Sequence, residues 1–243
     1  AVLVEERTDV SIHEASIIAI NPDTNQAFGF HQVDPTTGLA AAPGTFEAPL
    51  YTIANAATTD TANADNIIYV QAGDAGGTFT LPDGVDVHSV GPTQLLNTQF
   101  GDVILPGSGS GELPTISGTA TIGNNSLISG LAIDPAGADG IVANGENIAI
   151  EDNVITNADI GINLPVSDGT VSIVGNQIAN TADDGIFFGF LNGMDDTTVD
   201  IVDNTLDAIG ADNEFDANGI EFEGIFEDAT ANITVANNQI TNT

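Results

Sequence analysis

The feature that most constrains this chain is one short pattern that returns five times between residues 120 and 243. It reads apolar, any residue, apolar, any two residues, Asn, any residue, apolar. The asparagines of the five copies, separated by 28, 23, 28 and 34 residues, are Asn125, Asn153, Asn176, Asn204 and Asn238. A repeat of this length is typical of a supersecondary unit that stacks on its own copies. We therefore expect a solenoid, which lengthens by adding coils.

Each copy begins as a short strand with one buried face, because β-branched residues alternate with polar ones, as in Val171-Ser-Ile173. The Asn then falls at a corner. Asn tolerates the left-handed conformation that a tight corner needs, and its amide can bond an identical amide one coil away. A second apolar stretch, such as Ile160-Gly-Ile162, follows the corner in four copies. One coil is therefore expected to contain a strand, an Asn corner, a second strand and a variable loop.

This order of elements resembles the coils of the pectate-lyase-like superfamily and of the β-helix repeat proteins of bacterial cell surfaces. The resemblance implies an all-β fold, a right-handed parallel β-helix. Residues 44–56 are similar to the entry segment of many such proteins, where a short helix plugs the first coil, and we expect that helix within residues 50–58. A resemblance of this kind indicates the fold far better than the function.

Residues 1–34 stand outside the repeat and contain strand-like segments on both sides of the turn at 21–25. We expect a hairpin there that covers the open end of the stack or pairs with another chain. The predicted division is an N-terminal strand segment at 1–34 and a parallel β-helix at 35–243. Within the helix, entry coils occupy 35–114 and regular Asn-corner coils occupy 115–243.

The charge excludes several functions, because the chain has 35 Asp or Glu and a single cation, Arg7. Such a chain neither neutralises nucleic-acid phosphates nor docks on an anionic membrane surface. No apolar run approaches the roughly 18 residues of a membrane span. A hydrophobic content of 42% excludes an acidic disordered tail. Two interpretations of the carboxylates remain, a solvated surface and a surface on which Ca²⁺ bridges some of them.

One loop has the spacing of a calcium site, with oxygen-bearing side chains at every second position. These are Asp212, Glu214, Asp216 and Asn218. The loop lacks the glycine at the sixth position and the glutamate at the twelfth that an EF-hand has, so a solvated loop is the alternative. Long acidic loops also follow other coils and should gather on one or two sides of the stack. The possible ligand surface comprises Asp195, Asp196, Glu227 and Asp228.

The motifs of β-helix enzymes are incomplete. β-Helix pectate lyases use a cationic base, usually Arg, and Arg7 lies outside the repeat. Polygalacturonase-type hydrolases combine Asn-Thr-Asp, Asp-Asp and Gly-His-Gly, of which only Asp183-Asp184 is present, placed before Gly185 as turn residues would be. A carboxyl pair from adjacent coils stays open as an acid and base. The aromatic cluster Phe187, Phe188 and Phe190 fits an interior stack or a sugar platform.

Two functions follow from these observations. The first is a non-enzymatic structural or adhesive β-helix protein. One hypothesis is that its subunits associate end to end, with residues 1–34 of one copy covering the last coil of the next, and the alternative is that the chain is one part of a longer β-helix. The second is a polysaccharide-active or carbohydrate-binding β-helix. The chain opens at Ala1 without a basic leader, as a secreted protein does after signal-peptide removal, so we expect an extracellular or cell-surface location.

Overall fold

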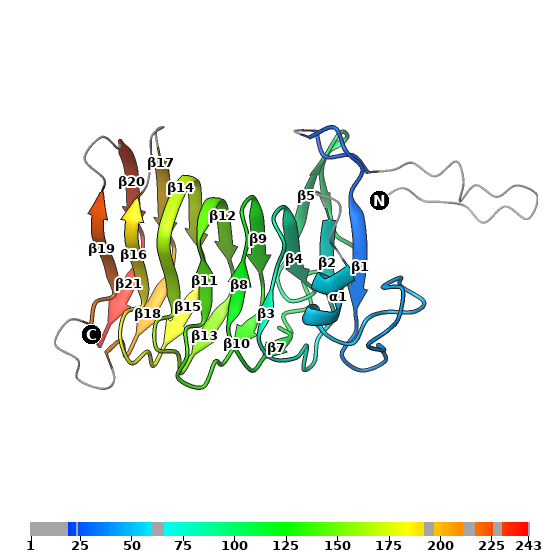
Figure 1. Cartoon of the computed structure of the whole chain (residues 1–243), viewed down its shortest axis with the longest axis horizontal. Coiled ribbons are helices and arrows are strands. Elements are labelled where there is room, and N and C mark those ends of the chain that lie inside the picture. The colour runs from blue at the N-terminus through cyan, green and yellow to red at the C-terminus, as the bar shows by residue number, and fades with distance from the viewer. Residues whose placement is uncertain are drawn as a thin grey trace, which may run out of the picture.

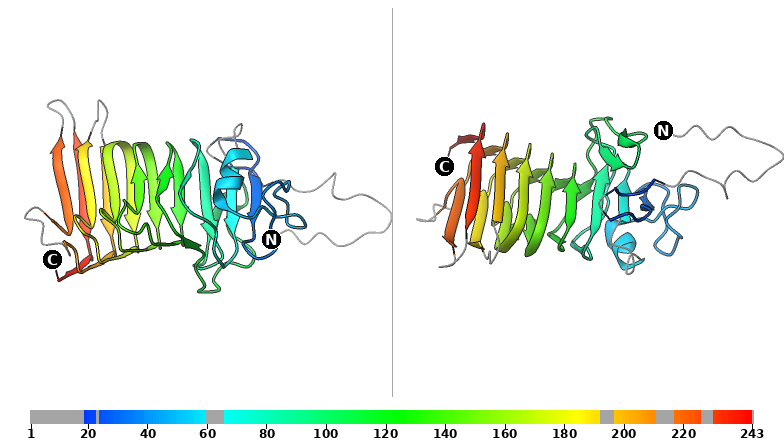
Figure 2. Two further views of the ribbon diagram at one scale, coloured as in Figure 1. Left: turned by 60° about the horizontal axis from the view of Figure 1, so that its bottom comes forward. Right: turned by 90° about the horizontal axis from the view of Figure 1, so that it is seen from above.

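The computed structural model describes residues 19–22, 24–59, 66–191, 197–210, 217–225 and 230–242. The strands lie across the long axis of the molecule and stack in parallel from the N-terminal end to the C-terminal end (Figure 1). In the regular coils, successive strands of the chain belong to different stacks, so each turn adds one strand to each stack (Figure 2). The architecture is a parallel β-helix, as expected from the repeat.

The stacks form three strand columns. The first column contains β1 (Gly29–Val33), β2 (Asn66–Val70), β4 (Val85–Ser89), β9 (Ser126–Ser129), β12 (Gly145–Glu151), the second half of β14 (Ile162–Val174), β17 (Thr197–Val202) and β20 (Ala231–Ala236). The second contains β7 (Thr115–Ile116), β10 (Ala132–Ile133), β13 (Val154–Thr156), β15 (Gln177–Ala179), β18 (Thr205–Asp207) and β21 (Gln239–Thr241). The third contains β3 (Phe79–Thr80), β8 (Ala120–Ile122), β11 (Ile141–Ala143), the first half of β14, β16 (Ile186–Leu191) and β19 (Ile220–Ile225).

The interior is filled by columns of like side chains, because the strands pair in register. Ile128, Ile150, Ile173 and Ile201 occupy one register position of the first column and are completely buried. The third column contains an aromatic pair, in which the rings of Phe188 and Phe222 stack with their centroids 4.7 Å apart. Phe188 therefore lies in the interior, whereas Phe190 is 41% exposed and lies outside.

The helix expected within residues 50–58 is confirmed as α1 (Ile53–Thr59), which lies at the N-terminal end of the stack (Figure 1). The Thr52 hydroxyl caps it by accepting the N–H of Asn55 at 3.1 Å. A helix of this length is unstable alone, and it is held by burial of Ile53 and Ala56 against the first coils. Among the described residues, no helix has the length and apolar character of a membrane span.

The N-terminal strand joins the stack directly. β1 pairs in parallel with β2 over five residues, so residues 29–33 form the outermost described strand of the first column. Of the expected hairpin, the described residues show an antiparallel bridge between Ile20 and Ala27 around the turn. Residues 1–18, which belong to the predicted end-to-end contact, lie outside the described residues.

An insertion between β4 and β7 covers part of the outer face of the first column. It contains the antiparallel hairpin of β5 (Leu95–Thr98) and β6 (Gly101–Ile104). Beneath it lies a second, smaller core formed by Ile67, Tyr69, Val90, Leu96 and Leu105. This cover explains why every residue of β2 is buried, although one face of the strand points away from the main core.

A ladder of four asparagines, three of them buried, ties four coils together at the corner between the first and second columns. The Asn153 side-chain amide donates to Asn176 Oδ1 at 3.1 Å, Asn176 to Asn204 at 3.0 Å, and Asn204 to Asn238 at 3.0 Å. The amide of Asn176 also donates to the carbonyl of Ile150 at 2.8 Å. Asn153, Asn176 and Asn204 bond in both directions along the stack. Asn238 donates back to the carbonyl of Ile201 at 2.7 Å, so every ladder amide is paired.

Asn125 is not part of this ladder, contrary to the sequence expectation. The strand that stacks on Ile148–Ile150 is Ser126–Ile128, whose corner is Gly130-Leu131. The backbone N–H of Leu131 donates to Asn153 Oδ1 at 3.0 Å, as the backbone N–H of Asn153 does to Asn176 Oδ1, but Leu131 has no side-chain amide to add the second bond. Asn125 lies at an earlier corner, before β9, where its Oδ1 accepts the amide of Asn147 at 2.9 Å.

The left-handed residue of the corner also differs from the expectation. It is the residue directly before each ladder asparagine: Asp152, Gly175, Asp203 or Asn237, with φ between 54° and 70°. The ladder asparagines are absent from the residues with positive φ. The left-handed residue turns the chain, which allows the next side chain to point into the stack.

Removal of one ladder amide should destabilise the fold strongly. We predict that Asn176→Ala lowers the free energy of unfolding by about 2–4 kcal/mol, because it leaves the buried N–H of Asn153 unpaired and removes the side-chain bonds to Ile150 and Asn204. The matched control is Asn147→Gly in the exposed corner, with an expected loss below about 1 kcal/mol. Urea denaturation followed by circular dichroism measures both. Equal losses in the two variants would contradict a special role for the buried ladder.

Candidate functional site

Most of the acidic residues predicted as sites lie outside the described residues. They are Asp195, Asp196, Asp212, Glu214, Asp216, Glu227 and Asp228. Calcium binding by the 212–218 loop and ligand binding by the acidic surface therefore stay predictions. Asn218 is described, and its side-chain amide donates to Glu221 Oε2 at 3.0 Å. The described part of the chain contains no group of three or more His, Asp or Glu residues arranged as metal ligands.

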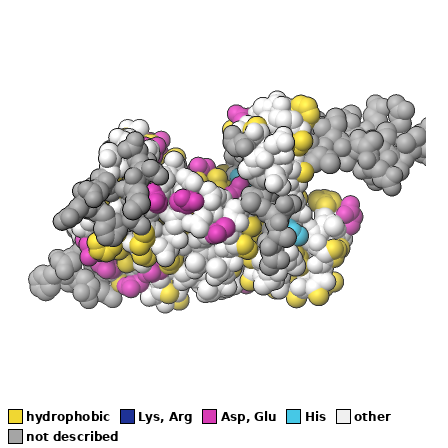
Figure 3. Space-filling view, turned by 45° about the horizontal axis from the view of Figure 1, so that its top comes forward, with side chains coloured by type: hydrophobic (Ala, Val, Ile, Leu, Met, Phe, Trp, Pro, Cys, Tyr) yellow, Lys and Arg dark blue, Asp and Glu magenta, His cyan; other side chains and the backbone are white. Residues whose placement is uncertain are grey.

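The acidic side chains that are described spread over several coils (Figure 3). The described residues contain no Lys or Arg, because Arg7, the single cation, lies within residues 1–18. No carboxylate in this part of the chain therefore has a described Lys or Arg with which to form an ion pair. A ligand that carries negative charge would be repelled.

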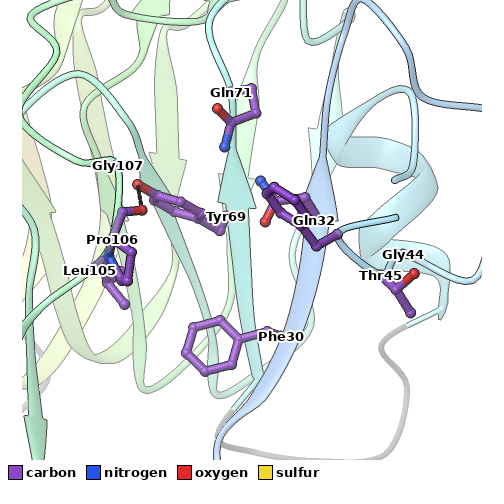
Figure 4. Close-up of a pocket in the computed structure, with 10 residues that line it drawn as sticks. Phe30, Gln32, Gly44, Thr45, Tyr69, Gln71, Leu105, Pro106 and Gly107 are labelled. Atoms are coloured by element: carbon purple, nitrogen blue, oxygen red, sulfur yellow. Dashed lines mark hydrogen bonds between the residues drawn. The ribbon is translucent and has the colours of Figure 1, made fainter. Parts of the chain in front are cut away.

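A cavity of about 370 Å³ lies on the outer face of the first column, at the N-terminal end (Figure 4). Strands β1 and β2 form its floor, the loop at residues 44–46 forms one side, and the end of the insertion forms the other. Its lining consists of Phe30, Gln32, Gly44, Thr45, Phe46, Tyr69, Gln71, Leu105, Pro106 and Gly107. The volume falls within the range of small-molecule sites.

Strand geometry explains why these side chains converge. Successive side chains of a strand point to opposite faces, and Val33 and Ile68 are completely buried in the main core. Gln32 directly precedes Val33 and Tyr69 directly follows Ile68, so both side chains project outward. The parallel register places them side by side. In Figure 4 the side chains of Phe30, Gln32, Tyr69 and Gln71 surround one space.

The cavity combines aromatic rings with amides. Phe30 is 47% and Phe46 81% exposed, while Tyr69 is buried and its hydroxyl donates to the Pro106 carbonyl at 3.1 Å. Burial raises the pKa of Tyr69, which therefore stays neutral. The Nε2 atom of Gln32 is buried without a hydrogen-bond partner. An unpaired buried donor is costly, so this atom favours a ligand that carries an acceptor.

The insertion that forms one wall is fixed by a buried polar cluster. His88 Nδ1 lies 2.8 Å from Gln94 Oε1, and Gln94 Nε2 donates to Ser129 Oγ at 2.9 Å. An amide oxygen is an acceptor, so Nδ1 carries the hydrogen. His88 is 4% exposed, and burial lowers the pKa of its imidazole, which is neutral near pH 7.

The dipeptide Asp183-Asp184 lies at the corner before β16, as turn residues would. Asp184 is 2% exposed, and its Oδ1 accepts the N–H of Asn218 at 2.7 Å. Burial raises the pKa of Asp184 to about 7, and the neighbouring Asp183 and a hydrogen bond to Glu221 act in the same direction. No pattern in the sequence indicated that Glu221 lies near this corner.

The family model described as "right handed beta helix region" matches residues 95–243, which is more than half of the chain. The chain belongs to the right-handed β-helix family. No curated protein and no solved structure matches it. The cavity lies mostly before the matched region of this β-helix protein, because β1 and β2 precede residue 95.

The cavity was missed by sequence reasoning, although a signal was present. An aromatic residue, any residue and a glutamine occur in β1 as Phe30-His-Gln32 and at the end of β2 as Tyr69-Val-Gln71, where Gln71 directly follows the strand. This spacing puts an aromatic ring and an amide on the same face of a strand. The signal requires knowledge that β1 and β2 are neighbours, and 32 residues separate their ends, from Val33 to Asn66.

The buried His88 should make stability fall in acid. Its folded-state pKa is depressed, so its contribution is present above the unfolded pKa of about 6.5 and is lost as the pH falls below it. In the wild type, we predict that the free energy of unfolding falls by up to about 1.4 kcal/mol for each pH unit below the unfolded pKa of His88. In His88→Gln this fall should be absent. Urea denaturation of both proteins at pH 7.5 and pH 5 tests this. Identical pH dependence of the two proteins would contradict it.

Proposed function

We propose that this β-helix protein is a non-enzymatic, extracellular adhesive protein that binds an uncharged polysaccharide in the cavity. The observation that carries the proposal is the convergence of aromatic rings and glutamine amides on one hollow. A polysaccharide ligand is itself extracellular, which is the reason for the location. The stack of coils would act as a rigid support for the binding site.

A pyranose ring has an apolar face and polar hydroxyl groups, and each of the two matches part of this lining. Its C–H face is apolar and packs against aromatic rings, which Phe30 and Phe46 present to solvent. Its hydroxyl groups both donate and accept, so they complement the amides of Gln32 and Gln71. A hydroxyl oxygen next to Gln32 Nε2 would remove a desolvation penalty of about 1–3 kcal/mol.

Binding without cleavage is favoured by the same lining. Its ten residues include no Asp, Glu or His, the groups that act as acid and base on a glycosidic bond. The lining also has no cation to pair with a carboxylate or sulfate. Because the chain carries a net charge of −34, an anionic saccharide would be repelled, whereas a neutral one would not.

The proposal predicts aromatic-dependent binding of neutral oligosaccharides. Isothermal titration with cellohexaose, mannohexaose and laminarihexaose should give binding by at least one of them, and none by hexagalacturonate. Phe46→Ala and Gln32→Ala should each weaken that binding about tenfold, the effect of losing one stacking contact or hydrogen bond of about 1.4 kcal/mol.

The matched control is Phe100→Ala, which removes an aromatic ring that is 66% exposed on the insertion outside the cavity. It should bind as the wild type does. An equal loss of affinity in Phe100→Ala and Phe46→Ala would contradict the assignment of the cavity. Binding of the anionic hexagalacturonate would contradict it as well.

A second candidate function, structural self-association, is favoured by the last described coil. Ile233, Val235 and Ile240 are 39%, 52% and 43% exposed, whereas the residues that pair with them one coil earlier are completely buried. These earlier residues are Val199, Ile201 and Leu206. A second copy seated on this face would bury the three side chains and pair the open strand edge.

Self-association predicts a mass that rises with protein concentration and with salt, which screens the repulsion between acidic copies. Sedimentation velocity at several concentrations measures it. Val235→Asn should reduce association, and the control Val202→Asn, on the outward face of β17, should leave it unchanged. A protein that stays monomeric at every concentration in high salt would rule out this second function.

A further inference from the structure

Both ends of one cavity wall are hydrogen-bonded to Gln94, a residue that is not part of the lining. This wall consists of Leu105, Pro106 and Gly107. At one end, the N–H of Leu105 donates to the carbonyl of Gln94 at 2.9 Å. At the other end, the N–H of Gln94 donates to the Ser108 hydroxyl oxygen at 3.1 Å. The backbone of Gln94 therefore holds the wall from both sides.

The side chain of Gln94 fastens this arrangement to the first column. Tyr69, His88 and Ser129 occupy one register position of β2, β4 and β9, on the outer face. Gln94 Oε1 lies 2.8 Å from His88 Nδ1, and Gln94 Nε2 donates to Ser129 Oγ at 2.9 Å. Gln94 is 5% exposed, so water does not compete for these two bonds. The row that forms the cavity floor at Tyr69 is thus the row to which the insertion is fastened.

Apolar packing attaches the insertion to the coils, but it does not fix the position of the wall. Leu96 and Leu105 are buried in the smaller core with Tyr69. Hydrophobic burial is non-directional, whereas a hydrogen bond requires a defined distance and angle. The bonds of Gln94 therefore determine where the wall lies, and the apolar contacts keep it attached.

We propose that Gln94 is a positioning residue for ligand binding in the cavity, an inference that rests on the proposed saccharide site. Gln94 does not line the cavity and acts through Leu105 and Ser108. The wall in its present place accepts the Tyr69 hydroxyl on the Pro106 carbonyl at 3.1 Å (Figure 4). A wall displaced by about 1 Å would lose this bond, because a donor and an acceptor more than about 3.5 Å apart no longer form one.

The first test needs no ligand and uses tyrosine fluorescence. The chain has no Trp and two Tyr, Tyr51 and Tyr69, so in a Tyr51→Phe background this fluorescence reports Tyr69 alone. Tyr69 is 7% exposed, and acrylamide should quench it poorly. Adding Gln94→Leu should raise the quenching constant about threefold, because a displaced wall uncovers the ring. An unchanged constant in the folded variant would overturn the positioning role.

The second test measures affinity by isothermal titration with cellohexaose, mannohexaose and laminarihexaose. Gln94→Leu should weaken binding of the hexasaccharide that the wild type binds about tenfold, which corresponds to about 1.4 kcal/mol. The matched control is Asn176→Ala, which loses stability at a ladder corner several coils from the cavity and should bind as the wild type does. Equal weakening in the two variants would indicate a general loss of stability and would overturn the proposal. Wild-type affinity and raised quenching together in Gln94→Leu would also overturn it, because the position of the wall would then not matter for binding.

Gln94→Glu is the conservative variant. Its carboxylate accepts from His88 Nδ1 and from the Ser129 hydroxyl, which can donate as well as accept, so quenching and affinity should return to within about threefold of the wild type. A folded Gln94→Glu protein that behaves as Gln94→Leu does would overturn the proposal.

Ser129→Ala keeps the test decisive if Gln94→Glu does not fold. It removes one of the two side-chain bonds of Gln94, so its quenching and affinity should lie between those of the wild type and Gln94→Leu. Values equal to those of the wild type would overturn the proposal. If quenching rises as expected while the wild type binds none of the three hexasaccharides, the saccharide function fails and the placement of the wall by Gln94 stands.

Discussion

The in-register pairing of each coil with the next is the constraint on which the rest of this molecule depends. Parallel strands leave every backbone group in need of a partner one coil away, and every side chain lies beside the residue at the same position of its neighbours. A polar residue can be buried in such a stack only if its copies bond one another. The ladder from Asn153 to Asn238 satisfies this requirement with hydrogen bonds of 3.0 to 3.1 Å between successive amides.

The same constraint explains how much of the fold could be predicted from the sequence. The pattern around Asn153, Asn176, Asn204 and Asn238 repeats because the register repeats, so the coils and their ladder could be read from it. The match at Asn125 arose because a second corner, before β9, also has alternating apolar residues followed by Asn. Sequence spacing does not distinguish the two corners, and only the pairing of β9 with β12 shows which one continues the ladder.

The candidate site could not be predicted in this way, because it lies where the repeat is absent. The cavity is formed by β1, β2, a loop and an insertion, whose neighbours in space are far apart in the chain. Its contacts depend on the smaller core beneath the insertion and on the cluster of His88, Gln94 and Ser129. Regular coils thus provide a rigid support, and irregular segments provide chemical diversity on its surface.

The ladder also determines how such a protein can change its length. Its asparagines are separated by 23, 28 and 34 residues along the chain, yet the amide-to-amide step is the same within 0.1 Å. Residues inserted between two ladder positions extend a loop without altering the rise from coil to coil. In evolution, loops can therefore grow by any number of residues, whereas the stack itself can gain or lose only complete turns.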